Sequence, residues 1–304
     1  MSNILEEIEA RFAAAGCTGA LHVQSLGSGA EVALHADAPM VAASAIKIVV
    51  ALEFFCQAYE GRIDPHTSVD IDPAETTPGP TGLSNFEDRA TVSLRDLAEL
   101  MMTISDNAAT DILIGRLGLD HLNARAAACG CMSTRIISNI ATMLDSVGAD
   151  MGFGSYRALL EAQSGRLGQA ARLKSIDPAA MEACRALDPK RATCTTARDM
   201  TRFLNAVWRD HADPKACLSL RNLMERQVSR RMEPAVLPGG VLAAKSGGLF
   251  RRIRNEIGVI SAPDGPAFAF AIFTRAKHPD LSAPVINNAM ADIVGLAIAR
   301  LQAT

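Results

Sequence analysis

The chain is organised around the stretch Ala43-Ser44-Ala45-Ile46-Lys47-Ile48-Val49-Val50. This stretch predicts the first turn of a buried helix, on which Ser44 and Lys47 share one face because they are three residues apart. A serine hydroxyl is a weak nucleophile until a base takes its proton, and a lysine made neutral by burial can be that base. An isolated Ser-x-x-Lys also fits a serine-capped helix with a surface lysine, so the rest of the chain must decide.

The composition is that of an ordinary globular protein. The chain has 304 residues, of which 49% are hydrophobic and 21% charged, enough for one large domain or two interleaved ones. The formal net charge is −3 and the pI is about 6.1. A nucleic-acid-binding protein carries a basic footprint, so we expect no nucleic-acid partner.

Seven cysteines are scattered along the chain. An odd, scattered set indicates free thiols rather than a disulfide framework. Cys129-Gly130-Cys131 is the only close pair, and neither a second pair nor histidines follow it at zinc spacing. We therefore expect no metal and no other cofactor.

The first residues, Met1–Glu9, lack the basic start and apolar core of a secretory signal. No apolar run looks long enough for a membrane span, so no membrane partner is expected. As written, the chain is expected to be cytoplasmic, and periplasmic or secreted only if a signal was removed. The sequence does not indicate an oligomeric state.

The pattern of elements predicts an α+β fold, an α/β sandwich. Strand-like segments occur at both ends of the chain, at 20–26, 30–35, 241–246, 256–261 and 267–274, and helical periodicity fills the middle. The simplest assembly is an antiparallel sheet made by both ends and flanked by terminal helices, with a central all-helical lobe. We expect residues 1–43 and 200–304 to form the α/β domain, and 44–199 the helical domain, including an atypical region at 132–190.

Two further motifs follow the first in order, Ser105-Asp106-Asn107 and Lys245-Ser246-Gly247. Together the three resemble the class A serine β-lactamases and their penicillin-binding relatives. The Thr195-Thr196 start of a helix and the strands after Lys245 are also similar to the family. The loop at 64–90, rich in Pro, Gly, Thr and Asp, is long enough to be functional.

The resemblance implies a role for each motif residue. Ser44 would attack a carbonyl carbon and form an acyl-enzyme, and Lys47, kept neutral by burial and by Lys245, would take the serine proton. Ser105 would pass a proton to the leaving nitrogen. Asn107 would hold Lys47 and the substrate amide.

On the last motif, Lys245 and Ser246 would bind the substrate carboxylate. The backbone N–H groups of Ser44 and Gly248 would form the oxyanion hole. Arg251 is a further candidate for the carboxylate, with a solvated strand edge as the alternative. The expected partner is a small-molecule amide or lactam that carries a carboxylate.

The chain departs from the family before Thr195. The family's Glu-x-x-Leu-Asn motif, whose glutamate activates the deacylating water, is absent, and Thr193 stands where an aspartate is expected. Glu182 is the nearest acid and the candidate deacylation base, with Glu161 and Asp188 as weaker candidates. The alternative for all three is a solvated helix face.

Three functions follow from this departure. The first is a β-lactamase-like serine hydrolase that opens a lactam or other amide through a Ser44 acyl-enzyme. The second is an amidase or esterase on a non-antibiotic cytoplasmic substrate. The third is a penicillin-binding or catalytically silent module that lacks efficient deacylation.

Overall fold

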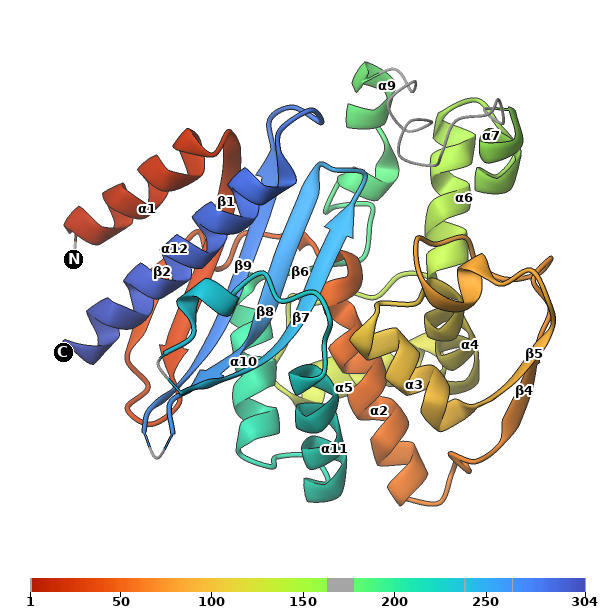
Figure 1. Ribbon diagram of the computed structural model, residues 1–304, viewed down its shortest axis with the longest axis horizontal. Coiled ribbons are helices and arrows are strands. Elements are labelled where there is room, and N and C mark those ends of the chain that lie inside the picture. Colours follow the sequence, from red (N-terminus) through yellow and green to blue (C-terminus); the bar gives the residue numbers. More distant parts are fainter. Residues whose placement is uncertain (1, 163–177, 238, 264, 304) are drawn as a thin grey trace.

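The computed structural model describes residues 2–162, 178–237, 239–263 and 265–303. Its centre is a five-stranded antiparallel sheet in the order β2-β1-β9-β8-β7 (Figure 1). The strands are β1 Cys17–Ser25, β2 Glu31–Leu34, β7 Val241–Leu249, β8 Ile253–Ser261 and β9 Ala267–Ala276. Because β1 pairs with β9, the two ends of the chain meet in one sheet, which confirms the predicted α+β architecture.

The terminal helices cover one face of this sheet (Figure 1). They are α1 Ser2–Ala14 and α12 Ala283–Gln302. By length and composition alone α12 could cross a membrane, so the expectation that no run is long enough was wrong. In the fold, its residues Met290, Ile293 and Val294 are fully buried in the same apolar core as the outer face of the sheet.

Three helices pack against the other face and form the largest core of the described residues. They are α2 Lys47–Tyr59, α10 Ala197–Trp208 and α11 Pro214–Glu225. Thr196 begins α10 as predicted, because its hydroxyl accepts a hydrogen bond from the Asp199 backbone N–H. α2, buried along most of its length, therefore lies between the sheet and the helical lobe, where ligand pockets often form.

The helical lobe continues through α3 Leu94–Thr103, α4 Asn107–Leu117 and α5 Leu119–Ala128. Ser93 caps α3, because its hydroxyl accepts a hydrogen bond from the Asp96 backbone N–H. The 64–90 loop is not irregular throughout, because its two ends pair as β4 Ser68–Ile71 and β5 Ala90–Ser93, and a 3₁₀ turn, η2, covers Gly82–Asn85. The proposed domain boundaries at 43/44 and 199/200 stay a prediction.

The region at 132–190 has its own small apolar core. Its described helices are α6 Ile140–Asp150, α7 Tyr156–Ala162, α9 Pro178–Glu182 and the 3₁₀ turn η3 Arg185–Leu187. The sequence predicts helices at 156–163 and 178–186, but not α6; position 163 lies outside the described residues. Two-residue strands, β3 Met40–Val41 and β6 Cys194–Thr195, join this region to the approach to Ser44.

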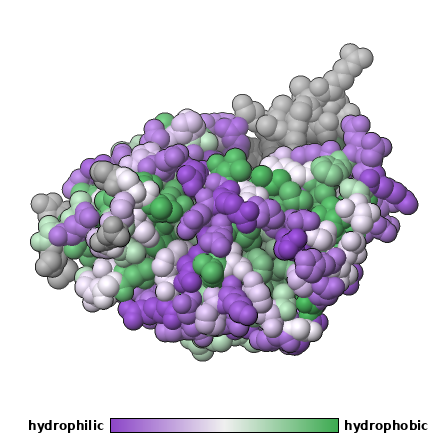
Figure 2. Space-filling view, turned by 60° about the horizontal axis from the view of Figure 1, so that its bottom comes forward, coloured by the Kyte–Doolittle hydropathy of each residue, from purple (hydrophilic) through white to green (hydrophobic). Residues whose placement is uncertain are grey.

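The surface gives no single dominant patch on the face that Figure 2 shows. Hydrophilic residues are spread across it, and hydrophobic residues form scattered patches between them (Figure 2). Scattered apolar side chains are normal on protein surfaces. This face therefore does not by itself indicate a ligand-binding site.

Candidate active site

Ser44 lies in a single 3₁₀ turn, η1 Ala43–Ile46, that runs directly into α2. The residue before it, Ala43, has φ 46°, a left-handed conformation that residues other than glycine rarely adopt. β3 leads into this turn and is fixed by its pairing with β6. The serine is thus held at the start of a buried helix, partly exposed, at the edge of a pocket.

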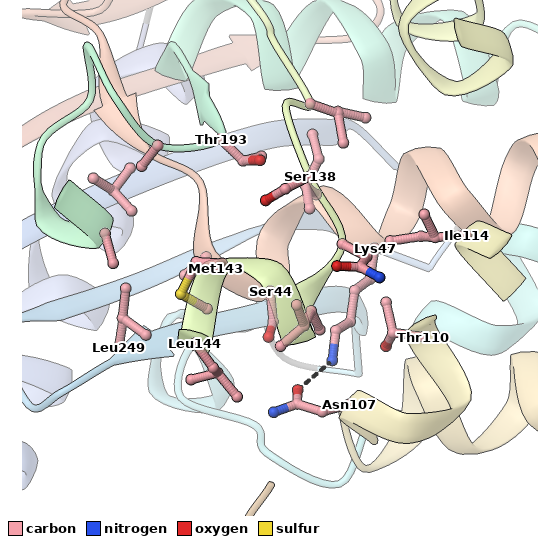
Figure 3. Close-up of a pocket in the computed structure, with 18 of the residues that line it drawn as sticks. Ser44, Lys47, Asn107, Thr110, Ile114, Ser138, Met143, Leu144, Thr193 and Leu249 are labelled. Carbon is pink, nitrogen blue, oxygen red and sulfur yellow. Dashed lines mark hydrogen bonds between the residues drawn. The ribbon is translucent and has the colours of Figure 1, made fainter. Parts of the chain in front are cut away.

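Lys47 is buried and surrounded by acceptors from the second motif. Its Nζ donates to the Ser105 carbonyl at 2.7 Å, the Asp106 carbonyl at 3.3 Å and Asn107 Oδ1 at 3.2 Å, the last of which Figure 3 draws. The Ser105 hydroxyl lies 3.3 Å away. Among the described residues its hydrogen bonds run to 105–107 and not to Ser44.

Burial controls the protonation of Lys47. It lowers the pKa of the ammonium from 10.5 to about 7, although the carboxylates of Asp106 and Asp111 oppose the change. The sequence predicts that Lys245 helps to keep Lys47 neutral, but Lys245 is not among the groups that lower the pKa of Lys47. A group with this pKa exchanges a proton readily near neutral pH.

The turn at 105–107 is built to present its side chains. Ser105 has φ 62°, and the fully buried Asp106 caps α4 by accepting from the Ala109 N–H at 3.1 Å. Asp106 also accepts from the Leu83 N–H at 2.7 Å, and the Asn107 side chain donates to the Pro78 carbonyl at 3.0 Å. The 64–90 loop is therefore tied directly to the second motif.

The third motif lies on β7. Lys245 is fully buried, and its Nζ donates to the Ser246 carbonyl at 2.9 Å and to Gln227 Oε1 at 3.4 Å. Burial holds its pKa well below the usual value, and the positive charges of Lys47 and Arg231 lower it further. Lys245 thus belongs electrostatically to the same site as Lys47.

Gly247 explains why β7 can approach the serine. A Cβ atom at this position would lie 3.3 Å from the Ser44 backbone nitrogen and 3.1 Å from that of Ala45. A side chain here would crowd the start of the nucleophile turn. Gly248, the next residue, lines the pocket together with Ser44.

The arginines after β7 take different positions. Arg251 is exposed at the β7–β8 turn with φ 61°, and stays a prediction as a carboxylate ligand. Arg254 is half-buried, and its Nε donates to Asn287 Oδ1 at 2.9 Å. Burial, with Arg231 and Arg251 nearby, lowers the pKa of Arg254 to about 10.

The predicted deacylation base lies elsewhere. The Glu182 carboxylate is paired with both Arg252 and Arg275, and Glu182 is not among the residues lining the pocket. Burial alone would raise the pKa of Glu182, but Arg275 and Arg252 outweigh it and lower the pKa. A carboxylate held in two ion pairs is a poor proton acceptor.

The two weaker candidates are also outside the pocket lining. Glu161 is exposed on α7. Asp188 accepts from the backbone N–H of Lys190 and from Arg191 at the surface. Among the described residues, no carboxylate lines the pocket, and Lys47 is the one ionisable group that does.

The pocket itself is a cavity of about 110 Å³ beside Ser44. Figure 3 shows Met143 and Leu144 of α6 and Leu249 of β7 grouped beside Ser44, with Ser138 and Thr193 at another side. Within the described ranges, no group of three or more His, Cys, Asp or Glu side chains is placed to hold a metal ion. The arrangement suits nucleophilic chemistry carried by the chain's own side chains.

Sequence reasoning missed three residues around the site. Gln227 supplies the acceptor for Lys245, and no motif signals it. Asp111 holds the start of α6 by accepting from the N–H groups of Ile140 and Ala141 at 2.7 Å each. Asn139 caps α6, and an asparagine before an apolar run is a helix-start signal that was available.

Comparisons with known proteins agree with this geometry. The family model of the beta-lactamase enzyme family matches residues 3–300. A beta-lactamase regulatory protein, BlaB of Streptomyces cacaoi, is 27% identical over 318 residues, covering 96% of this chain and 95% of that protein.

Solved structures share the fold. PBP-A is 20% identical, with a TM-score of 0.76 over 100% of this chain and 97% of that one. A β-lactamase from Sphaerobacter thermophilus is 21% identical, with a TM-score of 0.76 over 100% and 98%. A putative class A β-lactamase, PenP from Rhodopseudomonas palustris, is 19% identical, with a TM-score of 0.75 over 98% and 99%.

Proposed function

Because the chain belongs to the beta-lactamase enzyme family, we propose that it is a serine hydrolase that opens a lactam or other amide through an acyl-enzyme on Ser44. One observation carries the proposal. Lys47, with a pKa of about 7, lies about one helical turn from Ser44 and contacts both Ser105 and Asn107. A base with this pKa, placed beside a partly exposed serine, is what acyl transfer needs.

In the acylation step, Ser44 Oγ forms a bond to the carbonyl carbon while its proton passes to neutral Lys47. Backbone N–H groups of Ser44 and Gly248 stabilise the oxyanion. Collapse of the tetrahedral intermediate breaks the carbon–nitrogen bond. The leaving nitrogen takes a proton from Ser105, which Lys47 replenishes across the 3.3 Å contact between them.

Lys245 and Ser246 are proposed to bind the substrate carboxylate. A lysine with a strongly lowered pKa gains charge when an anion arrives, because the anion replaces lost solvation. Arg251 could contact the same anion from the exposed β7–β8 turn.

Deacylation requires water and a proton acceptor. Glu182 is bound to two arginines away from the pocket lining, so we do not assign it this role. In the part of the chain that the structure describes, Lys47, once it has returned its proton, is the one ionisable lining residue that could take a proton from water. Turnover by this route is expected to be slow, because that part places no second acid–base group in the pocket lining.

A second candidate function follows from the missing carboxylate. If Ser44 is acylated but the acyl group is not released efficiently, the protein is a covalent sensor of β-lactams rather than a resistance enzyme. The regulatory name of the Streptomyces cacaoi relative favours this candidate. An amidase or esterase on a non-antibiotic substrate uses the same acylation step and is separated from it by substrate choice.

The test is intact-mass spectrometry of the protein over time with a panel of β-lactams and small esters. A Ser44-dependent adduct that decays indicates hydrolysis, and one that persists indicates the covalent sensor. Ser44→Ala should remove the adduct, whereas Ser133→Ala, at an exposed serine outside the pocket, should keep it. An adduct that survives in Ser44→Ala, or no adduct with any compound, would reject the proposal.

A further inference from the structure

The pocket extends from Ser44 along α6, and Asn107 is the one residue of the other two motifs that lines it. Much of its apolar wall comes from η1, from α4 and from the segment 136–144, which leads into α6. The wall residues are Ile46, Ile114, Ile136, Ile140, Met143 and Leu144. Neither Ser105 nor Lys245 lines this space.

Several polar residues of the lining make hydrogen bonds within the protein itself. Thr110 Oγ1 donates to the Asp106 carbonyl, and Thr193 Oγ1 accepts from the Ile137 N–H at 3.2 Å. Asn139 Oδ1 accepts from the Thr142 N–H at 2.9 Å. These atoms already have partners, so few polar groups of the lining, among them the Ser138 hydroxyl, are left for a ligand beside the apolar wall.

The position of the pocket relative to Ser44 indicates which part of a substrate faces the apolar wall. In the proposed reaction the leaving nitrogen takes its proton from Ser105, so the leaving group lies on the Ser105 side of the carbonyl. The pocket lies at Ser44 but is not lined by Ser105. The part of the substrate that enters it is the acyl group.

We propose that this pocket binds an aliphatic acyl chain, so that the substrates are esters or amides of short to medium fatty acids. The inference rests on the proposed function. Among the described residues, Lys47 is the one ionisable group of the lining, and it must be neutral to act as the base. An acyl group bearing an ammonium would therefore lose its hydration and find no opposite charge, and one bearing a carboxylate would find none while Lys47 is neutral. An alkyl chain has no such cost and replaces water along an apolar wall.

The first experiment measures kcat/KM for p-nitrophenyl acetate, butyrate, hexanoate, octanoate and decanoate. Each methylene buried in the pocket should raise kcat/KM roughly four-fold, until the chain exceeds the cavity of about 110 Å³. Met143→Phe, which fills the wall, should lower the ratio of hexanoate to acetate by about ten-fold, and Met143→Ala should move the optimum to a longer chain. Met132→Phe is the matched control, because Met132 is 77% exposed and lies outside the pocket lining.

If kcat/KM rises with chain length as steeply in Met143→Phe as in Met132→Phe, the inference is overturned, because the chains are then bound elsewhere. A flat profile with Ser44-dependent turnover would also overturn it while the proposed function stands.

The second experiment removes the chemistry and tests the pocket alone. Calorimetric titration of Ser44→Ala protein with acetamide, butanamide and hexanamide should show affinity rising with chain length, and Met143→Phe in that background should abolish the rise. This result would support the pocket even if no ester were turned over. Affinity that does not depend on chain length would reject the inference independently of catalysis.

Discussion

The Nζ atom of Lys47 lies 2.7 Å from the carbonyl oxygen of Ser105, and 3.3 Å from its hydroxyl. Burial favours the neutral amine of Lys47, and the carboxylates of Asp106 and Asp111 favour the charged ammonium. The balance, a pKa of about 7, makes the protonation of Lys47 sensitive to pH in the working range. This gives the first prediction.

Acylation of Ser44 should rise with pH and level off above about 7, because only the neutral amine accepts the serine proton. Lys47→Arg should lower the rate by about 10²- to 10⁴-fold and remove the pH dependence, since a guanidinium does not deprotonate. The measurement is the labelling rate with a β-lactam or fluorophosphonate from pH 5 to 9. A profile that falls with pH, or wild-type rates in Lys47→Arg, would show that Lys47 is not the base.

The close approach of β7 to the nucleophile gives a second prediction. Gly247→Ala places a methyl group 3.3 Å from the Ser44 backbone nitrogen, so it should displace the turn that carries the serine and slow acylation at least ten-fold, the cost of about 1.4 kcal/mol in the barrier. The reactive N–H and Oγ would both move. Labelling rate and thermal unfolding are measured together.

Gly115→Ala is the matched control. A Cβ at this exposed position of α4 meets nothing within 4 Å. Alanine in a helix is favoured over glycine by about 0.5–1 kcal/mol, so the control should be as stable as the wild type or more so, with normal labelling. Equal labelling rates in Gly247→Ala and Gly115→Ala would argue against tight packing at Ser44.

Substitution of Glu182 distinguishes a deacylation base from a surface ion-pair partner of Arg252 and Arg275. If it activates water, Glu182→Gln should trap the acyl-enzyme. Because its carboxylate is held by Arg252 and Arg275, we expect unchanged deacylation and a loss of less than about 1 kcal/mol in unfolding free energy. Intact mass after pulse labelling, compared with wild type, checks the first point and urea denaturation the second. Accumulated adduct in Glu182→Gln alone would restore it as the base.

Much of this site could be predicted because its residues carry local signals. Helical spacing places Ser44 and Lys47 on one face. Ser93 and Thr196 are each typical helix-capping residues, and the strands at both ends show alternating hydrophobic and polar residues. Each signal depends on neighbours within a few residues along the chain. The order of the three motifs then predicted that distant segments meet.

The rest depends on contacts between segments that no local pattern records. Gln227 meets Lys245 only because the segment after α11 returns to β7. Asp111 reads as an ordinary helix residue, yet it fixes the start of α6. Distance along the chain from Thr195 points to Glu182, whereas the β7–β8 turn and β9 bring Arg252 and Arg275 to it.

Asp111 is the anchor of the pocket wall. Its carboxylate accepts three hydrogen bonds, from Thr77 Oγ1 and from the N–H groups of Ile140 and Ala141, each at 2.7 Å. Asp111→Asn replaces one acceptor oxygen by a donor, which should cost about 1–3 kcal/mol of unfolding free energy and loosen the start of α6.

Because Ile140 and Met143 belong to that wall, Asp111→Asn should also flatten the dependence of kcat/KM on acyl chain length. Asp120→Asn, at an acid in the first turn of the neighbouring helix α5, is the matched control. A destabilised Asp111→Asn protein with an unaltered chain-length profile would separate the anchor from the pocket.

The last prediction concerns Glu256, which is fully buried on β8 with Arg231 Nε at 3.9 Å. Both of its carboxylate oxygens lack a hydrogen-bond partner among the described residues. Burial raises the pKa of Glu256 from 4.5 to about 7, although Arg231 and Lys245 oppose the change. The folded protein therefore holds a proton that the unfolded chain has already lost between these two values.

The sign follows from linkage. Where the native state binds more protons than the unfolded state, the free energy of unfolding falls as pH rises. The contribution of Glu256 is fully present below about pH 4.5 and is lost as pH rises through 7, a decline on the order of 3 kcal/mol. Glu256→Gln cannot ionise, so urea denaturation at pH 5 and 7.5 should show a smaller decline than in wild type. Glu75→Gln, at an exposed glutamate, should follow the wild type, and a decline in Glu256→Gln as large as in that control would mean that Glu256 is ionised throughout this range.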